Sequence, residues 1–190
     1  MSQPRKFWMR WRVRVGYPVA VIFWLLASPT PHFILIGGFI AAAGLLIRGA
    51  AAGHLRKDRE LTTTGPYAYT RNPLYLGSSL LAAGFAVAGH SWIAAVVVMA
   101  YFSVFYYAVM RNEEEGLRER FGQVYESYAA RVPLFFPRLR SGAPGTPSPE
   151  KFSWPEYGRN REYQALIGTI VGVGFMWLRM WLSSQSFFRF

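Results

Sequence analysis

The sequence predicts an all-α protein, built as a multi-pass transmembrane helical bundle of about five spans. Hydrophobic residues make up 52% of the 190 residues, yet the formal net charge is +11, and this combination is typical of a basic membrane protein. The apolar residues also gather into five stretches, each expected to form a helix, at residues 15–27, 33–53, 74–89, 92–110 and 163–182.

The first stretch has only 13 residues, whereas a helix needs about 20 residues to cross the hydrocarbon core of a bilayer. It therefore has to extend into Phe7, Trp8 and Trp11, with the neighbouring arginines reaching back to the interface. Its basic start also resembles a signal peptide, although no clear small-x-small cleavage site follows. The sequence Ser-Pro-Thr-Pro then predicts a tight turn, so the first two stretches form a hairpin.

The second stretch is interrupted by Arg48 and the fifth by Arg179. Turn residues at 89–91 join the third and fourth stretches into a second hairpin. The fourth stretch leads into residues 111–132, where apolar side chains recur every three or four positions, which predicts one buried face of an interfacial helix. This helix is expected to lie along the membrane surface or to fold back on the bundle. Its apolar face consists of Leu117, Phe121, Tyr125, Tyr128 and Val132.

A change in composition marks the end of this region. Residues 141–149 read SGAPGTPSP, which predicts a flexible linker. The chain is therefore expected to consist of a membrane core at residues 1–140, a linker with an amphipathic segment at 141–162, and an additional span at 163–190.

Lysine and arginine are distributed unevenly along the chain. Five precede residue 15, five lie within residues 48–71, nine lie within residues 111–161, and only two lie elsewhere. The first three groups place 19 of the 21 basic residues on one side, which the positive-inside rule identifies as cytoplasmic. Membrane topology therefore explains the charge, and we expect membrane lipids rather than nucleic acid as partners.

Several kinds of site are excluded by the side chains available. The sequence contains no cysteine, so disulfides, thiolate zinc sites and cysteine nucleophiles are ruled out. The three histidines lie far apart, so we expect neither a metal site nor a Ser-His-Asp triad. No GxGxxG motif follows a strand, which argues against a soluble dinucleotide-binding domain.

The stretch GPYAYTRNPLYLG, residues 65–77, leads into the third apolar stretch. Because the residue before a proline is biased away from helix, Asn72 is expected to cap a helix that begins at Pro73. A helix start carries unpaired N–H groups that suit an anion, and Arg71 adds a bidentate donor beside it. The three tyrosines of the stretch either form an interfacial aromatic belt or line an adenine or ribose: Tyr67, Tyr69 and Tyr75.

A second polar cluster follows the fourth apolar stretch, in RNEEEGLRERFGQVYESY at residues 111–128. Glu114 and Arg118 are spaced i,i+4, as on a solvated charged helix face. Three consecutive carboxylates at the mouth of a membrane span are nevertheless costly unless they are paired or functional. Arg71 and Arg111 are the expected partners that neutralise them.

Together, the two clusters resemble the signature of the isoprenylcysteine carboxyl methyltransferase and phospholipid methyltransferase superfamily. The family pattern GPYxxxRHPxYxG corresponds to residues 65–77, the pattern EExxLxxxFGxxYxxY to residues 113–128, and the closing VPxxxP to residues 132–137. We call these three segments the first, second and closing motifs. The match spans about two-fifths of the chain, residues 61–137, and the joint order and spacing of the motifs make it specific.

The resemblance implies an enzyme that holds S-adenosyl-L-methionine in a cytoplasmic pocket and methylates a lipophilic acceptor: a lipid or small molecule bearing an isoprenylcysteine-like carboxylate, an amine or a phenol. It implies cofactor-binding roles for Thr64, Gly65, Tyr67, Tyr69, Arg71, Asn72, Pro73, Tyr75 and Glu114. It implies catalytic roles for Arg71, Arg111, Glu113 and Glu114. An amine or phenol would need one of these glutamates to take its proton, whereas an acceptor carboxylate would not.

The sequence departs from the family pattern at Asn72, where the family usually has histidine. Asparagine can still hydrogen-bond a cofactor, but it does not titrate near neutral pH, so a proton-transfer role is lost there. Two other functions remain open. A related membrane reductase would bind NADPH through basic residues, against which the paired glutamates argue, and a non-catalytic membrane scaffold would keep only the fold.

Overall fold

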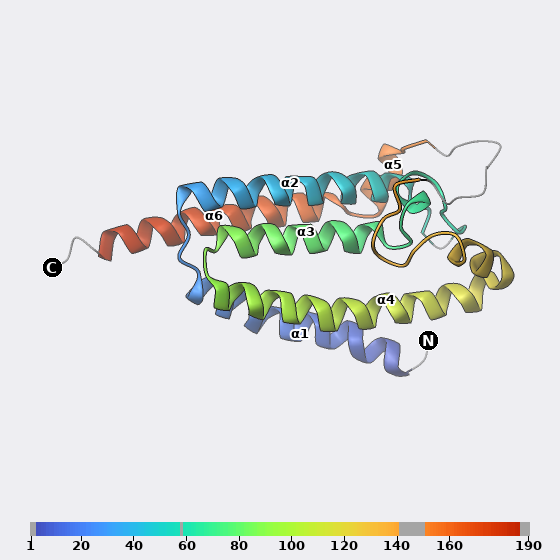
Figure 1. Ribbon diagram of the computed structural model, residues 1–190, viewed down its shortest axis with the longest axis horizontal. Coiled ribbons are helices and arrows are strands. Elements are labelled where there is room, and N and C mark those ends of the chain that lie inside the picture. The colour runs from blue at the N-terminus through green and yellow to red at the C-terminus, as the bar shows by residue number, and fades with distance from the viewer. Residues whose placement is uncertain (1–2, 58, 141–150, 187–190) are drawn as a thin grey trace. The chain divides into compact units, whose positions relative to one another are not determined.

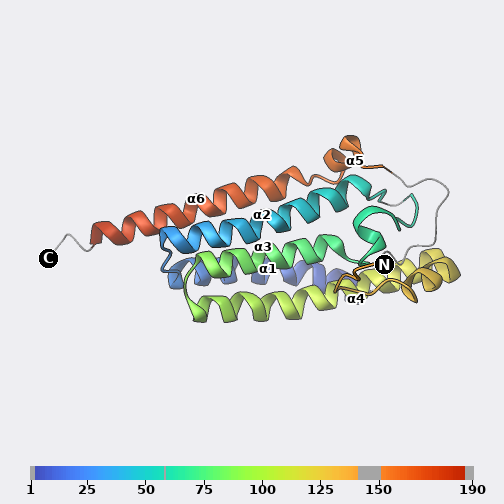
Figure 2. The same cartoon turned by 45° about the horizontal axis from the view of Figure 1, so that its top comes forward.

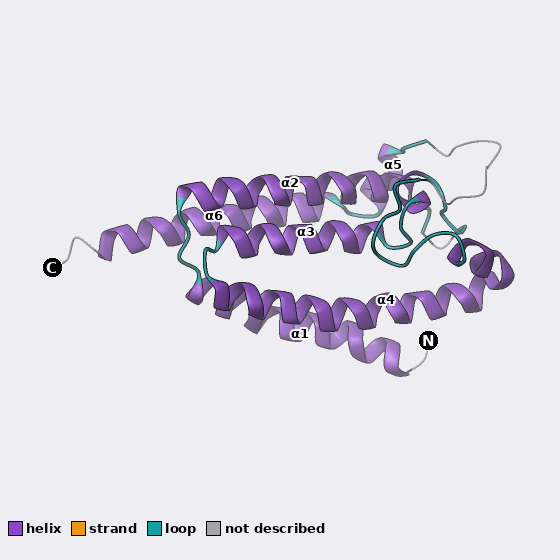
Figure 3. Cartoon of the chain, viewed as in Figure 1, coloured by secondary structure: helices purple, strands orange, loops and turns teal. Residues whose placement is uncertain are grey.

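The computed structural model describes residues 3–57, 59–140 and 151–186. Figure 1 shows these residues as helices joined by loops, and Figure 3 shows no strand among them. The all-α class predicted from the sequence is confirmed. In chain order, the elements are α1 (Gln3–Leu26), α2 (Pro31–His54), η1 (Gly65–Ala68), α3 (Pro73–Ala88), α4 (Trp92–Ala129), α5 (Trp154–Arg159) and α6 (Tyr163–Ser186).

Three of the described helices, α2, α4 and α6, are long and apolar enough to cross a membrane. Helix α3 is apolar but has only 16 residues. Any 18 consecutive residues of α1 include Arg10, Arg12 and Arg14, so the helix has no uncharged segment of the length that a membrane crossing needs. Only its carboxyl-terminal half is apolar. The predicted multi-pass bundle is confirmed, and three of its five expected spans meet the requirements for a full crossing.

Contacts within the chain define two compact units. The first contains Met1–Ala43, Ser79–Val109 and Ile167–Phe190, and the second contains Gly44–Ser78 and Met110–Leu166. Each unit thus combines segments that are far apart in the sequence. The predicted flexible linker lies outside the described residues, and the division into core, linker and additional span stays a prediction.

In the first unit, α1 runs alongside the first part of α4 (Figure 1). The hydroxyl of Tyr101 in α4 donates a hydrogen bond of 2.7 Å to the carbonyl of Arg12 in α1. The two predicted turns also meet, because the N–H of Ser28 donates to the carbonyl of Gly89 over 2.8 Å. Four helices and the turn after α1 supply the buried apolar side chains of this unit, which include Phe23, Ala27, Ile34, Ala94 and Met176.

Helices α2 and α3 run side by side (Figure 2), and their backbones approach closely where small residues face each other. A Cβ atom added to Gly37 would overlap the carbonyl oxygen of Gly84 and would lie 2.8 Å from the Cβ atom of Ala88. A Cβ atom added to Gly84 would lie 2.5 Å from the carbonyl oxygen of Gly37. Small residues at such a crossing let two membrane helices pack backbone against backbone.

We expect Gly37→Ala to lower the free energy of unfolding by about 1–3 kcal/mol, the usual cost of forcing an extra methyl group into a packed contact. Gly38→Ala is the matched control, because a Cβ atom there meets no atom within 4 Å. Both substitutions gain the same helix propensity, about 1 kcal/mol, so their difference isolates the contact. Thermal unfolding in detergent measures that difference, and equal midpoints would contradict the close crossing.

In the second unit, α4 continues beyond its apolar part and carries the amphipathic segment. The helix bends at Gly122, whose φ of 50° and ψ of −126° are not helical. In Figure 1, the carboxyl-terminal end of α4 changes direction. The periodic apolar pattern did not predict this bend. It did predict the buried face, which is confirmed: the cluster consists of Tyr125, Tyr128 and Val132, with Leu61, Leu117 and Phe121 packed against them.

Candidate functional site

The first and closing motifs lie against each other in the second unit. The N–H of Arg71 donates to the carbonyl of Pro133 over 2.9 Å, and the N–H of Arg138 donates to the carbonyl of Tyr69 over 3.0 Å. These bonds satisfy backbone groups that a loop would otherwise leave unpaired. The closing motif and the residue after it therefore hold the backbone in front of α3.

Two side chains of the first motif strengthen this contact. The hydroxyl of Thr70, a buried residue, donates to the carbonyl of Phe135 over 2.8 Å. The side-chain nitrogen of Asn72 donates to the carbonyl of Leu134 over 3.0 Å. Thr70 was not predicted from the sequence. The one feature that could have indicated it is its place between Tyr69 and Arg71, which were both predicted site residues.

Helix α3 begins at Pro73, as predicted. The carbonyl of Asn72 accepts hydrogen bonds from the N–H groups of Tyr75 and Leu76 over 3.1 and 3.0 Å. The side-chain nitrogen of Asn72 is engaged elsewhere, in its hydrogen bond to the carbonyl of Leu134. A cap would use the side-chain oxygen of Asn72 as an acceptor, so the predicted side-chain cap stays a prediction.

Glu114 is the centre of the charged cluster in this unit. Its side chain is only 2% exposed, and its carboxylate contacts three arginines. Arg71 pairs with Oε1, Arg111 pairs with Oε2 over 2.7 Å, and Arg118 lies 3.5 Å from Oε1. Arg71 and Arg111 are therefore confirmed as partners, whereas the reading of Glu114 and Arg118 as a solvated pair is wrong, because Glu114 is buried.

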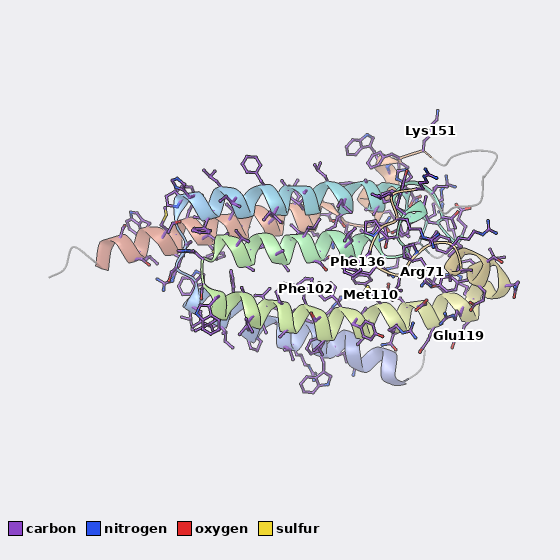
Figure 4. All side chains as sticks on the ribbon, viewed as in Figure 1. Arg71, Phe102, Met110, Glu119, Phe136 and Lys151 are labelled. Atoms are coloured by element: carbon purple, nitrogen blue, oxygen red, sulfur yellow. The ribbon has the colours of Figure 1, made fainter. Side chains whose placement is uncertain are left out.

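Arg71 reaches this carboxylate from the first motif, and Figure 4 shows it beside the part of α4 that follows Met110. Its Nη1 atom also donates to the hydroxyl of Tyr125 over 3.1 Å, and its guanidinium lies 5.9 Å from the centre of that ring. Its Nε atom is buried and has no hydrogen-bond partner in the part of the chain that the structure describes. A buried donor without an acceptor is costly, so this atom is well suited to an oxygen of an anionic ligand.

The cluster also keeps an excess of positive charge. Arg118 shares its charge with Glu126 at 2.8 Å. Three arginines and two carboxylates then leave one positive charge. The start of α3 adds the positive end of a helix dipole. The cluster therefore favours an anionic group.

Glu113 has different surroundings from its neighbour Glu114. The hydroxyl of Tyr75 donates to Oε1 of Glu113 over 2.8 Å, at an exposed position. Tyr69 is exposed as well. The structure therefore separates the two predicted carboxylates: Glu114 is enclosed by arginines, and Glu113 is accessible.

Gly65 is placed where only glycine fits. Its φ is +57°, in the left-handed region that glycine adopts without strain. A Cβ atom there would lie 2.6 Å from the imidazole ring of His54, and Nδ1 of that ring is 2.7 Å from the carbonyl of Ala50. The adjacent Thr64 has a buried hydroxyl with no hydrogen-bond partner among the described residues, as Arg71 has a buried Nε without one.

Tyr67 is buried, and its carbonyl accepts a hydrogen bond of 2.7 Å from the hydroxyl of Tyr128. Burial raises the pKa of the Tyr67 phenol above its ordinary value, because the charged phenolate would be poorly solvated. The phenol therefore stays protonated at neutral pH. Tyr67 is a structural part of the site and not a base.

Comparison with known proteins identifies similar sequences. A family model described as phospholipid methyltransferase matches residues 34–124. The nickel-cobalt-cadmium resistance protein NccN of Alcaligenes xylosoxydans xylosoxydans is 35% identical over 142 residues, which are 67% of this chain and 66% of NccN. The cobalt-zinc-cadmium resistance protein CzcN of Cupriavidus metallidurans is 39% identical over 84 residues, which are 44% of this chain and 38% of CzcN.

A further relative is the protein-S-isoprenylcysteine O-methyltransferase of Schizosaccharomyces pombe. It is 26% identical over 129 residues, which are 65% of this chain and 55% of the relative. The chain thus spans between about two-fifths and two-thirds of the length of these three proteins. No solved structure matches the chain.

Proposed function

Because the chain belongs to the membrane superfamily of phospholipid and protein-S-isoprenylcysteine methyltransferases, we propose that it transfers a methyl group from S-adenosylmethionine to a lipophilic acceptor. The observation that carries this proposal is the cluster around Glu114. It joins the first and second motifs through Arg71, and it keeps one buried cationic donor, Arg71 Nε, without a partner among the described residues.

The charges of the cluster fit the cofactor. S-adenosylmethionine carries a carboxylate, an ammonium group and a sulfonium group, and when bound it supplies an electrophilic methyl group. Arg71 Nε and the start of α3 suit the carboxylate. Glu113, which is accessible, suits one of the positive groups. Since methyl transfer is an in-line displacement, holding the reactants in place is most of what the protein has to supply.

The two carboxylates differ in what they can do for the acceptor. The oxygens of Glu114 are taken up by three arginines. Among the described residues, Glu113 accepts a hydrogen bond from Tyr75 at an exposed position. If the acceptor is an amine or a phenol, Glu113 is therefore the residue that takes its proton. An acceptor carboxylate needs no base.

The position of the site in the cell is also part of the proposal. The protein is an integral membrane protein with several apolar helices. The basic residues around the three motifs support a cytoplasmic site through the positive-inside rule. A reporter fused to the carboxyl terminus tests this, because five spans and an inside amino terminus put that end outside.

The names of two relatives refer to resistance to metals. For this chain we propose that any role in metal tolerance depends on the same methyl transfer and does not involve a second reaction. Within the described residues, no three His, Asp or Glu side chains are grouped to hold a metal ion. If metal tolerance depends on methyl transfer, cells that carry a variant unable to bind the cofactor lose their tolerance to these metals.

The proposed function is tested by Arg71→Ala. Losing a charge-assisted bond to a buried anion costs about 1.5–3 kcal/mol, so affinity for S-adenosylhomocysteine should fall roughly ten- to over a hundredfold. Glu114 keeps Arg111 and Arg118 as partners, so the variant is expected to stay folded. Isothermal titration of the detergent-purified protein measures the change.

Arg131→Ala is the control, because it removes the same charge from an exposed position. Titration with NADPH in parallel separates the methyltransferase from a reductase. Binding of NADPH alone would support the reductase, and binding of neither ligand would support a scaffold. An unchanged affinity in Arg71→Ala would contradict the assignment of Arg71.

A further inference from the structure

Arg48 interrupts the apolar sequence of α2, a helix long enough to cross a membrane. Its side chain is 22% exposed. A charged side chain within a membrane span is costly, and it normally pairs or serves a function. The contacts of Arg48 therefore need an explanation.

The partner of Arg48 is Glu162, 114 residues further along the chain and directly before α6. Nε donates to Oε1 over 2.5 Å, and Nη2 donates to Oε2 over 3.0 Å. The side chain of Glu162 is 6% exposed. Two parallel bonds between a guanidinium and a carboxylate fix the orientation of both groups. Glu162 thus neutralises Arg48 and also sets where its remaining nitrogen points.

That remaining nitrogen, Nη1, contacts the beginning of α3. It donates to the hydroxyl of Ser78 and lies 3.4 Å from the carbonyl of Leu74. The two helices are close at this level, because a Cβ atom added to Gly77 would lie 2.6 Å from the carbonyl of Gly44. Arg48 therefore links Glu162 to the first two turns of α3, which contain the last residues of the first motif.

The segment before Glu162 is itself tied to the end of α2. The N–H of Ser153 donates to the carbonyl of Gly53 over 2.9 Å. The side-chain nitrogen of Asn160 donates to the carbonyls of Ala52 and Leu55, both over 2.9 Å. These bonds satisfy the last carbonyls of the helix. The backbone that carries Glu162 is thereby held on the helix that carries Arg48.

We propose that Glu162 is a positioning residue of the candidate site: it orients Arg48, and Arg48 holds the start of α3, where the first motif ends. Residues 153–162, which follow the predicted linker, are then part of the site. This inference rests on the proposed function only because its binding test uses S-adenosylhomocysteine as the ligand.

Glu162→Gln tests the proposal because it keeps the size of the side chain and removes its charge. We expect affinity for S-adenosylhomocysteine to fall about tenfold in the detergent-purified full chain, as for the loss of one well-placed hydrogen bond to a charged group. Glu162→Asp keeps the charge and should restore at least part of the affinity. Thermal unfolding of each variant is measured beside the titration.

Glu156→Gln is the matched control. Glu156 is also buried, lies in the same segment, and pairs with Arg159 at 2.7 Å and with Arg59 at 4.0 Å. The loss of the Glu156 charge should leave the affinity for S-adenosylhomocysteine unchanged. If Glu156→Gln weakens binding as much as Glu162→Gln, or if Glu162→Gln binds like the wild type, the positioning role is overturned.

A second readout does not depend on the proposed function. The chain has no cysteine, so spin labels can be attached to cysteines placed at the exposed Tyr69 and Val124. Glu162→Gln should broaden the distribution of distances between the labels, and Glu156→Gln should not. If the wild type fails to bind S-adenosylhomocysteine, the proposed function is wrong. The distribution of distances between the labels then decides the positioning role by itself. An unchanged distribution would overturn it.

Discussion

Glu114→Gln is expected to destabilise the protein by about 3–5 kcal/mol, the usual cost of removing one partner from a buried ion pair. The substitution leaves Arg71, Arg111 and Arg118 around a neutral amide. Arg71 is the most affected because it is 12% exposed, whereas the other two are 49% and 40% exposed and can turn to water. Binding of S-adenosylhomocysteine should be lost as well, since Arg71 is no longer held.

The neighbouring Glu113→Gln is the control for Glu114→Gln. Glu113 accepts one hydrogen bond from Tyr75 at an exposed position, so its removal should cost at most about 1 kcal/mol. Thermal unfolding in detergent and ligand titration are measured on both variants. Equal losses of stability would show that the burial of Glu114 among the arginines does not govern its contribution.

The second large effect is expected for Gly65→Ala. A residue with a side chain loses about 1–2 kcal/mol in the left-handed region, and the new Cβ atom would also lie 2.6 Å from the His54 ring. Overpacking of this kind adds about 1–3 kcal/mol. The free energy of unfolding, from thermal or denaturant unfolding in detergent, should therefore drop by roughly 2–5 kcal/mol.

A second substitution separates the two causes. In the double variant Gly65→Ala with His54→Ala, the contact is absent and only the backbone cost of Gly65→Ala should remain beyond the effect of His54→Ala alone. Gly158→Ala is the control, since a Cβ atom there meets nothing within 4 Å. If Gly65→Ala costs no more than Gly158→Ala, the close approach of His54 is not present in solution.

Much of the helical arrangement could be predicted because it depends on neighbours in the sequence. Long apolar stretches set the helices, and proline and turn residues set their ends, as at Pro73. The bend at Gly122 could not be predicted, because a glycine within a helical pattern is compatible with a straight helix. The periodicity of the segment still identified its buried face.

The candidate site was predictable only in part. The charges of Arg71 and Glu114 require partners at a span mouth, so their pairing followed from electrostatics. The direction of the Asn72 amide depends on a carbonyl of Leu134, 62 residues away. The partner of Arg48 is even more distant. Contacts of this kind depend on how the chain folds over long separations, which local patterns do not specify.

The separation of 114 residues between Arg48 and Glu162 has a consequence for biosynthesis. At about 5–20 residues per second, the ribosome makes Glu162 roughly 6–23 seconds after Arg48. During this interval the nascent α2 carries an unneutralised arginine, which opposes its entry into the lipid. We therefore expect α2 to stay at the translocation machinery until α6 arrives, and chains that stop before Glu162 to be degraded, which pulse-chase labelling of arrested chains would detect.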